Sequence, residues 1–260
     1  MVLDYTSTIT VDDCSDCLIV LAPCAGSVFI RDCESCTVLV ACQQLRTRDC
    51  RGLRLALHCA TQPIIEETTN AVFHPLTLHY DKFTDDMIGA RLSPFFSHST
   101  SVHDFTPEKS ELHYRLSSDV LPLNFDQISA LSSHGISTNP EDSDIPFRAG
   151  KLGASHFYYA GCSDGQPRFP FVERCQKVAQ AIAASPSLRL VDTNEVDMHK
   201  HGTKLGMAGK GLDKLVVFEV CGEEHDLEQL MSDGGFEKVT DYKESSFAAA
   251  LTSINQLMLS

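Results

Sequence analysis

The chain has 260 residues, 43% of them hydrophobic and 22% charged, which is typical of a globular protein with one large domain or two ordinary ones. Its 35 acidic residues outnumber its 21 basic ones, and the net charge of −14 argues against a nucleic-acid partner and against docking on an anionic membrane. We also expect no membrane anchor in the chain as given, because it contains neither a long apolar run nor a signal or myristoylation start.

The first part of the chain is repetitive. Three segments open with an Asp-Cys pair and continue with β-prone apolar residues: Val11 to Pro23, Ile30 to Cys42 and Thr47 to Cys59. The cysteines of these pairs, Cys14, Cys33 and Cys50, are 19 and then 17 residues apart. This spacing suits three short strands and three turns, so the repeat predicts one coil of a β-solenoid per segment.

Eight of the 11 cysteines lie in the first 59 residues, and without an export signal we expect them to be reduced thiols. Two Cys-x-x-Cys pairs, Cys14 with Cys17 and Cys33 with Cys36, also have the spacing of a four-cysteine zinc site. The third repeat has Leu53 where the other two have the second cysteine, which favours small packed side chains over metal ligands. Packed thiols are therefore the preferred interpretation, and structural zinc is the alternative.

Two motifs follow the second repeat, ACQQLRTRDC (Ala41 to Cys50) and CATQPIIE (Cys59 to Glu66). Together with SVHDFTP (Ser101 to Pro107), they resemble the signature of the tubulin-cofactor-C family, also called the C-CAP/cofactor C-like family. The resemblance implies a right-handed parallel β-helix that activates GTP hydrolysis by an Arf-like small GTPase. A weaker resemblance in the last hundred residues implies a ferredoxin-like, nucleoside-diphosphate-kinase-like domain.

The family motif also implies roles for individual residues. Arg46, the last residue of Gln-Gln-Leu-Arg, matches the arginine finger that enters the partner's active site. Gln43 and Gln44 match positions on the same contact surface, and Glu66 matches the interface glutamate that ends the second motif. Arg48 is expected to support the turn or the rim of the interface.

Arginine suits this role for a reason independent of the family. Catalysis of phosphoryl transfer depends on neutralising charge on the phosphate oxygens, and a guanidinium can bridge two oxygens while remaining charged. The alternative is that Arg46 is an ordinary outward side chain on a solenoid turn, because four arginines fall within nine residues here: Arg46, Arg48, Arg51 and Arg54. A shift of one residue in strand register would turn Arg46 inward, so its direction is left open.

We expect three segments: a β-helix domain over 1–122, a linker over 123–154 and a ferredoxin-like domain over 155–260. Relative to the family pattern, at least one coil before Val2 and the lipidated start are missing. Residues 71–105 are expected to finish and cap the solenoid, and the histidines among them have no metal-like spacing. The linker prediction rests on the Ser-, Asn-, Pro- and Asp-rich run around SSHGISTNPEDSDIP.

The last segment alternates strand and helix patterns in the order βαββαβ, which is ferredoxin-like. The strands are expected in 155–161, 188–196, 214–221 and 238–243, and the helices in 171–182, 224–232 and 246–259. The glycine-rich HGTKLGMAGKG (His201 to Gly211) does not fit the Walker spacing. We therefore expect a loop there, and a domain that serves interaction instead of nucleotide phosphorylation.

The leading hypothesis is a GTPase-activating protein for a GTP-bound Arf-like GTPase, acting in the traffic of lipidated proteins. Such a chain has no intrinsic enzyme activity and no cofactor of its own, since GTP and Mg²⁺ stay on the partner. The alternative is a binding module, either a GTPase effector or a tubulin-folding cofactor. We expect a cytoplasmic location, with the base of the cilium or flagellum, or the plasma membrane for a lipidated form, implied by the family.

Overall fold

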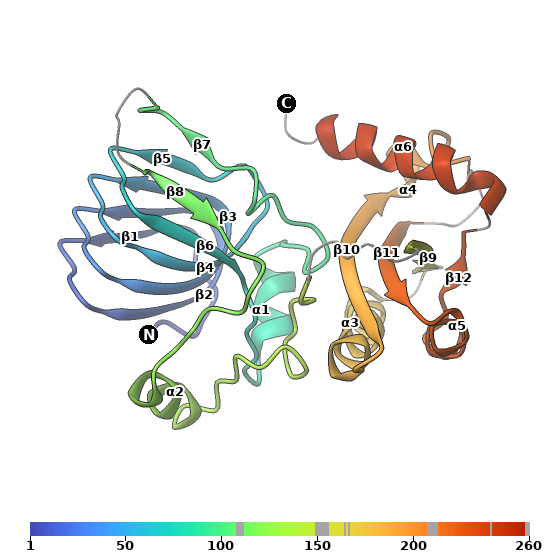
Figure 1. Cartoon of the computed structure of the whole chain (residues 1–260), viewed down its shortest axis with the longest axis horizontal. Coiled ribbons are helices and arrows are strands. Elements are labelled where there is room, and N and C mark those ends of the chain that lie inside the picture. Colours follow the sequence, from blue (N-terminus) through green and yellow to red (C-terminus); the bar gives the residue numbers. More distant parts are fainter. Residues whose placement is uncertain are drawn as a thin grey trace. The chain divides into compact units, whose positions relative to one another are not determined.

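The computed structural model describes residues 1–107, 112–148, 156–163, 165, 167–206, 213–239 and 241–257. The chain divides into two compact units, Met1–Ile145 and Pro146–Ser260. The first unit is a stack of strands and the second is a sheet with helices (Figure 1). Within the described residues, no helix is both long and apolar enough to cross a membrane.

The first unit is a parallel β-solenoid, as the repeats predict. Its strands are β1 (Ile9–Asp12), β2 (Leu18–Arg31), β3 (Thr37–Arg48), β4 (Arg54–Cys59), β5 (Ile64–Glu66), β6 (Ala71–Pro75), β7 (His103–Asp104) and β8 (Tyr114–Leu116). Strand β3 turns a corner, since Thr37–Cys42 pairs with β4 while Arg46–Arg48 pairs with β5. The two faces of this coil therefore meet at Gln43 and Gln44.

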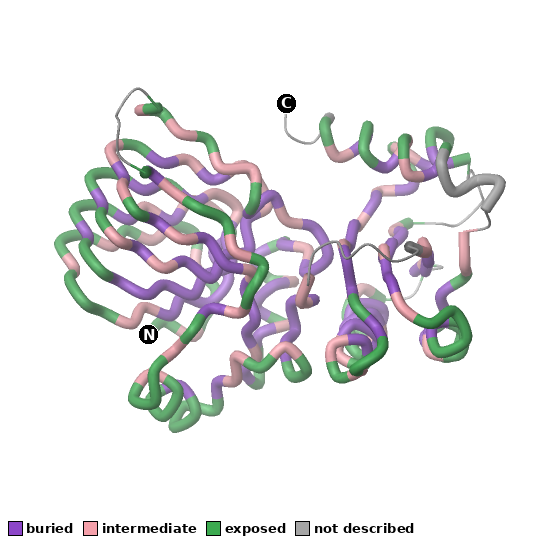
Figure 2. The backbone as a smooth tube through the Cα atoms, in the orientation of Figure 1, coloured by how far each residue is buried: buried purple, intermediate pink, exposed green. Residues whose placement is uncertain are grey.

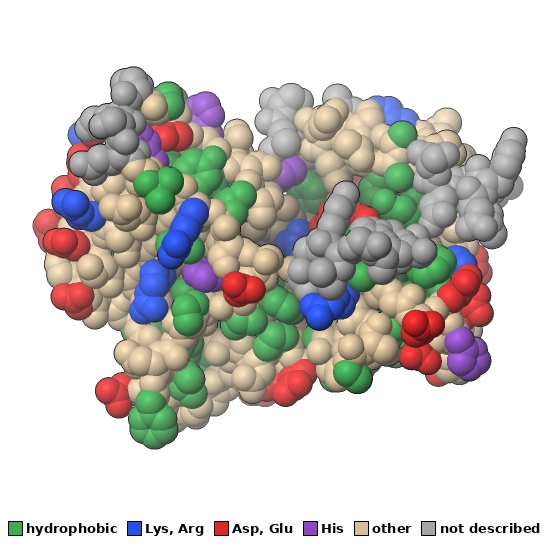
Figure 3. Space-filling view, in the orientation of Figure 1, with side chains coloured by type: hydrophobic (Ala, Val, Ile, Leu, Met, Phe, Trp, Pro, Cys, Tyr) green, Lys and Arg blue, Asp and Glu red, His purple; other side chains and the backbone are tan. Residues whose placement is uncertain are grey.

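The Asp-Cys pairs of the repeats form corners of the coils. Each aspartate has the left-handed backbone conformation, which most L-residues avoid and Asp and Asn tolerate best. The φ values are +54° for Asp13, +52° for Asp32, +50° for Asp49 and +46° for Glu67. Glu67 thus opens a fourth corner that the sequence pattern did not reveal. Acidic side chains line the edge of the solenoid in Figure 3.

The residue after each of these four corners adds a side-chain hydrogen bond to a backbone carbonyl. The side chain donates a hydrogen bond to the carbonyl oxygen two residues back, at 3.4 Å for Cys14, 3.1 Å for Cys33, 3.2 Å for Cys50 and 3.0 Å for Thr68. Thr68 therefore takes the place of cysteine in the fourth coil. This explains the Asp-Cys repeat, because the first residue tolerates the turn and the second caps it.

The difference between the 19- and 17-residue spacings is absorbed in β2. Three residues of β2 face two residues of β3 at two successive steps, which makes two one-residue bulges. The register pairs that bracket them are Leu21 with Val40, Cys24 with Cys42, and Ser27 with Gln44. Gly26 lies in the second bulge, where a Cβ would sit 2.3 Å from the carbonyl oxygen of Ser7. The backbone of β2 therefore touches the preceding segment closely just before Ser27.

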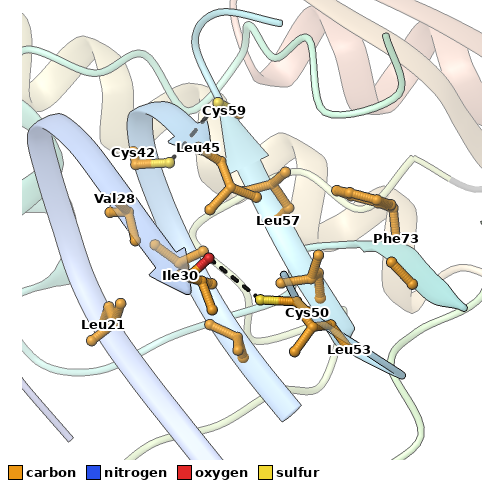
Figure 4. Packing of buried hydrophobic residues seen from close by; sticks show 14 of the residues in the cluster. Leu21, Val28, Ile30, Cys42, Leu45, Cys50, Leu53, Leu57, Cys59 and Phe73 are labelled. Atoms are coloured by element: carbon orange, nitrogen blue, oxygen red, sulfur yellow. Dashed lines mark hydrogen bonds between the residues drawn. The ribbon is translucent and has the colours of Figure 1, made fainter. Parts of the chain in front are cut away.

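The interior of the solenoid is apolar and includes most of the cysteines. Figure 2 shows buried residues along the strands and exposed ones at the outer edge, and Figure 4 shows cysteines stacked with leucine, isoleucine and valine. Cys33, Cys36 and Cys50 are buried in this core, as the packed-thiol interpretation expects. Cys17 is exposed instead. Among the described residues, no group of three or more His, Cys, Asp or Glu is placed to hold a metal ion.

The predicted linker is wrong for its first part. Helix α2 (Phe125–Ser132) begins at Asn124 with a capping box to Gln127. Leu131, Ile136 and Ile145 then pack into a second core on the outer side of the solenoid strands. Helix α1 (Phe83–Gly89), also unforeseen, contributes to the same core. A few well-spaced apolar residues thus fold this polar segment onto the first unit.

The second unit contains β9 (His156–Cys162), α3 (Arg168–Ala184), β10 (Leu188–Asp197), α4 (Met198–His201), β11 (Lys214–Gly222), α5 (Glu224–Asp233), β12 (Glu237–Lys238) and α6 (Asp241–Leu257). The strands form an antiparallel sheet in the order β10-β11-β9-β12, and the main elements follow the predicted βαββαβ order. The predicted strand over 238–243 is wrong for its last part, because α6 already begins at Asp241. Kinship with nucleoside diphosphate kinases stays a prediction. Residues 207–211 of the glycine-rich stretch lie outside the described residues.

Candidate functional site

Arg46 lies on the outside of the solenoid. In the second half of β3 the burial alternates, with Leu45 and Thr47 almost fully buried and Arg46 and Arg48 exposed. Strand geometry places alternate side chains on opposite faces, so this register turns both arginines toward solvent. The direction that the sequence left open is thereby settled.

Arg46 and its neighbours on adjacent coils share one outer surface, here called the arginine face. It comprises Phe29 and Arg31 on β2, Arg46 and Arg48 on β3, Ile64 and Glu66 on β5, and His103 on β7. In register, Arg46 lies between Phe29 and Ile64, both half-buried. The cation is therefore flanked by apolar side chains on either side.

Among the described residues, the Arg46 guanidinium has no ion-pair or hydrogen-bond partner. The neighbouring arginines do have partners. Arg48 donates to Asp49 at 3.1 Å, and Arg31 makes a two-pronged contact with Asp12 at 2.8 Å for both bonds. Arg46 is thus left available for an acceptor from another molecule, whereas Arg48 is held at its own corner.

Glu66 is the register partner of Arg48 on the next coil and is exposed. The spacing of neighbouring strands puts their backbones about 4.8 Å apart. Within the described part of the chain the Glu66 carboxylate has no bonding partner, since Arg48 turns to Asp49. The structure brings Arg46, Arg48 and Glu66 onto one face, as the family motif implies.

Gln43 and Gln44 lie at the corner that leads to this face, and both are half-buried. The carbonyl oxygen of Gln43 accepts from the backbone N–H of Thr61 at 3.0 Å and from its hydroxyl at 2.8 Å. The side-chain oxygen of Gln44 accepts from the Ser27 hydroxyl at 3.2 Å. The coils on both sides therefore hold the two glutamines.

The sequence pattern missed a buried hydroxyl pair beneath the arginine face. Thr47 and Thr68 are each 1% exposed, and their hydroxyl oxygens are 2.8 Å apart. Because Thr68 donates to the Glu66 carbonyl, it accepts from Thr47. Thr47 occupies a column in which the other coils have Val11, Ile30 and Ile65. A threonine in a column of branched apolar residues was the feature of the sequence that could have revealed the pair.

The buried thiols are poorly suited to attack a substrate. Burial raises the pKa of the Cys33 thiol to about 12 and also raises the pKa of Cys36 and Cys50. A thiol must lose its proton to act as a nucleophile. These residues therefore act as small apolar groups in this fold.

Two further polar clusters pair their charged groups internally. His113 Nδ1 bonds the Asp104 carboxylate, and burial of that carboxyl is outweighed by hydrogen bonds from Thr106 and His113, so the pKa of Asp104 falls below its usual value. In the second unit, a pocket of about 110 Å³ is lined by Ser163, Arg168, Phe171, Val172, Glu195, Asp213 and Lys214. Its cations Arg168 and Lys214 both lie near Glu195. Neither cluster offers an unpaired charge.

The fold and site define a β-solenoid protein that presents an exposed arginine, Arg46, without a partner among the described residues. Residues 1–105 match the family model described as Tubulin binding cofactor C, which confirms the resemblance read from the motifs over that stretch.

The chain is similar to "Protein XRP2" from Mus musculus, with 47% identity over 81 residues, which is 31% of this chain and 23% of that protein. For "Protein XRP2" from Danio rerio the identity is 42% over 115 residues, 44% of this chain and 31% of that protein. "Tubulin-specific chaperone C" from Bos taurus is 31% identical over 99 residues, 38% of this chain and 29% of that protein. These matches span about a quarter to a third of each relative.

A solved structure, "Tubulin Binding Cofactor C from Leishmania major", is 25% identical, with a TM-score of 0.37 over 52% of this chain and 86% of that chain.

Proposed function

We propose that this protein activates GTP hydrolysis by an Arf-like small GTPase, with Arg46 as the arginine finger supplied in trans. The observation that carries the proposal is the exposed Arg46 without an intramolecular partner among the described residues, on the face that also presents Glu66. The similarity to the tubulin binding cofactor C family supports a GTPase-related role.

The chemistry follows from the charge of the arginine. As the bond to the transferred phosphoryl group breaks, negative charge on the phosphate oxygens grows, and a guanidinium can bridge two of them. A stacked solenoid holds the backbone of β3 between β2 and β5, so only the side chain has to be ordered on docking. A finger supplied in this way accelerates hydrolysis by roughly 10³- to 10⁵-fold.

The other residues of the site serve contact with the partner. Gln43, Gln44 and Glu66 supply hydrogen-bonding groups, and Phe29 and Ile64 supply apolar area beside the arginine. Arg48 lies at the rim because its guanidinium already bonds Asp49. GTP and Mg²⁺ belong to the partner, and the chain acts as an activator without an enzymatic reaction of its own. Turnover of the GTPase would serve trafficking of lipidated proteins in the cytoplasm or near the base of a cilium.

The test is single-turnover GTP hydrolysis by a panel of Arf-like GTPases with the full chain. Arg46→Ala should remove the acceleration while complex formation persists, and Arg46→Lys should restore little of it because an ammonium cannot bridge two oxygens. Arg115→Ala is the matched control, since Arg115 is an exposed arginine on β8, away from the arginine face. Unchanged hydrolysis at stoichiometric wild-type protein across the panel would refute the proposal.

The alternative function is binding without catalysis, as a GTPase effector or a tubulin-folding cofactor. The similarity to proteins named tubulin-specific chaperone C favours keeping it. Binding of a GTP-loaded GTPase with equal hydrolysis rates for wild type and Arg46→Ala would support an effector. Co-purification with tubulin instead of a small GTPase would support the cofactor.

A further inference from the structure

The arginine face contains an oriented amide whose orientation is set from the neighbouring coil. Gln44 and Arg46 are two residues apart on β3, so their side chains leave the strand on the same side, about 6.6 Å apart along it. Gln44 is half-buried, and Ser27 of β2 is its register partner. The two residues are 17 positions apart in sequence and belong to adjacent coils.

The hydrogen bond between these residues determines which end of the amide is free. The Ser27 hydroxyl donates to Gln44 Oε1 at 3.2 Å, so the oxygen end of the amide is directed to β2. Glutamine carries an acceptor oxygen and an NH₂ group with two donors. Among the described residues nothing accepts a hydrogen bond from Gln44 Nε2, so both donors are available beside Arg46.

Ser27 itself is held in place by the backbone. It follows the second bulge of β2, which sets its register against Gln44. Gly26 immediately before it lies so close to Ser7 that a Cβ would come within 2.3 Å of the Ser7 carbonyl oxygen. The hydroxyl is therefore placed by close packing of three successive coils and not by a mobile loop.

We propose that Ser27 is a positioning residue that orients the Gln44 amide so that its NH₂ group donates to an oxygen acceptor of the docked GTPase beside the nucleotide. This inference rests on the proposed function and adds which side donates the hydrogen bond in one contact at that site. Ser27 does not touch the partner in this arrangement and acts through Gln44. The partner must present an oxygen acceptor, from a backbone carbonyl or a side chain, to Gln44, which lies two positions before Arg46.

Loss of the Ser27 hydroxyl should weaken binding of the GTPase. Without Ser27 the amide can rotate and present its oxygen, and the side chain regains rotamer freedom that docking must then remove. A hydrogen bond of ordinary strength corresponds to about a three- to tenfold change in affinity. Arg46 is untouched, so the maximal rate in the saturated complex should remain.

The experiment is single-turnover GTP hydrolysis at increasing concentrations of the full chain, which separates the half-saturating concentration from the maximal rate. Ser27→Ala should raise the half-saturating concentration about three- to tenfold with an unchanged maximal rate. Ser27→Thr keeps the hydroxyl and should behave as wild type. Gln44→Glu should bind at least as poorly as Gln44→Ala, because a carboxylate still accepts from Ser27 but cannot donate.

A double-mutant cycle separates positioning from a general structural effect. Adding Ser27→Ala to Gln44→Ala should cause no further loss, since Ser27 then has nothing to orient. An equal loss in both backgrounds, a normal half-saturating concentration for Ser27→Ala, or tight binding by Gln44→Glu would overturn the inference. If the wild-type chain gives no acceleration at all, the proposed function itself fails.

Discussion

The hydroxyl pair under the arginine face gives a sharp stability prediction. Replacing Thr68 by Val keeps the volume but removes the group that accepts from Thr47, which is 1% exposed. The Glu66 carbonyl retains the backbone N–H of Asp49 at 3.2 Å, so the Thr47 hydroxyl is the group left without a partner. An unsatisfied buried hydroxyl costs about 1–3 kcal/mol, and we expect the free energy of unfolding of the solenoid to fall by that amount.

The same geometry predicts that a second substitution reverses the loss. Thr47→Val alone should cost little, because Thr68 still donates to the Glu66 carbonyl at 3.0 Å. The double variant Thr47→Val/Thr68→Val leaves no hydroxyl unpaired and should be more stable than Thr68→Val alone. Thr68→Cys should also be mild, since Cys50 makes the equivalent bond one coil earlier. Ile65→Val, which deletes one buried methyl group in the same layer, calibrates ordinary core loss at about 1 kcal/mol.

The measurement is amide hydrogen exchange of β3 and β5 in the full chain, which reports the stability of this unit even if the second unit unfolds separately. Additive losses in the double variant would show that the hydroxyls are not coupled. A Thr68→Cys variant as unstable as Thr68→Val would show that the corner does not accept the thiol found in the other coils.

Three further predictions concern the corners, the Asp104–His113 contact and metal. Asp32→Val should destabilise the solenoid by about 1–2 kcal/mol, because the φ angle of Asp32 is +52° and a β-branched residue avoids that conformation. Asp32→Gly and the neighbouring control Glu34→Val should cost little, and thermal unfolding measures all three variants. The pKa of Asp104 is lowered in the folded state, so the stability that its carboxylate contributes is complete above the usual carboxyl range and is lost as pH falls through the lowered pKa. An acid titration of the unfolding free energy should show this loss, and Asp104→Asn should abolish the pH dependence. A metal chelator should leave the unfolding midpoint unchanged, because the buried Cys33, Cys36 and Cys50 thiols pack in the core; a fall in the midpoint would revive the zinc alternative.

The solenoid was predictable because stacked coils meet the same physical demand at each corner. Asp13, Asp32 and Asp49 each tolerate the left-handed turn, and a cysteine follows each. The fourth corner was not predicted because Glu67 and Thr68 make the same left-handed turn and carbonyl hydrogen bond with residue types other than Asp and Cys. A search for residues of equivalent conformation and hydrogen bonding, instead of for Asp-Cys itself, would have found it 18 residues after Cys50.

The folded character of residues 124–145 could not be read from composition. The run is rich in Ser, Asn, Pro and Asp, which is typical of a linker. Its packing depends on Leu131, Ile136 and Ile145, which have no regular period and meet the solenoid only in three dimensions. Ser143 and Asp144 are buried as well, each with hydrogen bonds to the segment near Leu78 and His79. Polar residues in this segment thus serve tertiary contacts that no local pattern encodes.

The identity of Arg46 was readable from a motif, but its availability depends on pairing between residues around it. The chain carries a net charge of −14, so an exposed arginine would ordinarily meet a carboxylate. On this face Asp12 is taken by Arg31 and Asp49 by Arg48. The arginines beside Arg46 therefore do more than add positive charge, because Arg48 binds the carboxylate of its own corner and Arg31 binds Asp12 on the preceding coil. The freedom of the Arg46 guanidinium in this acidic protein therefore arises from contacts within and between coils, and it is what the proposed role as an arginine finger requires.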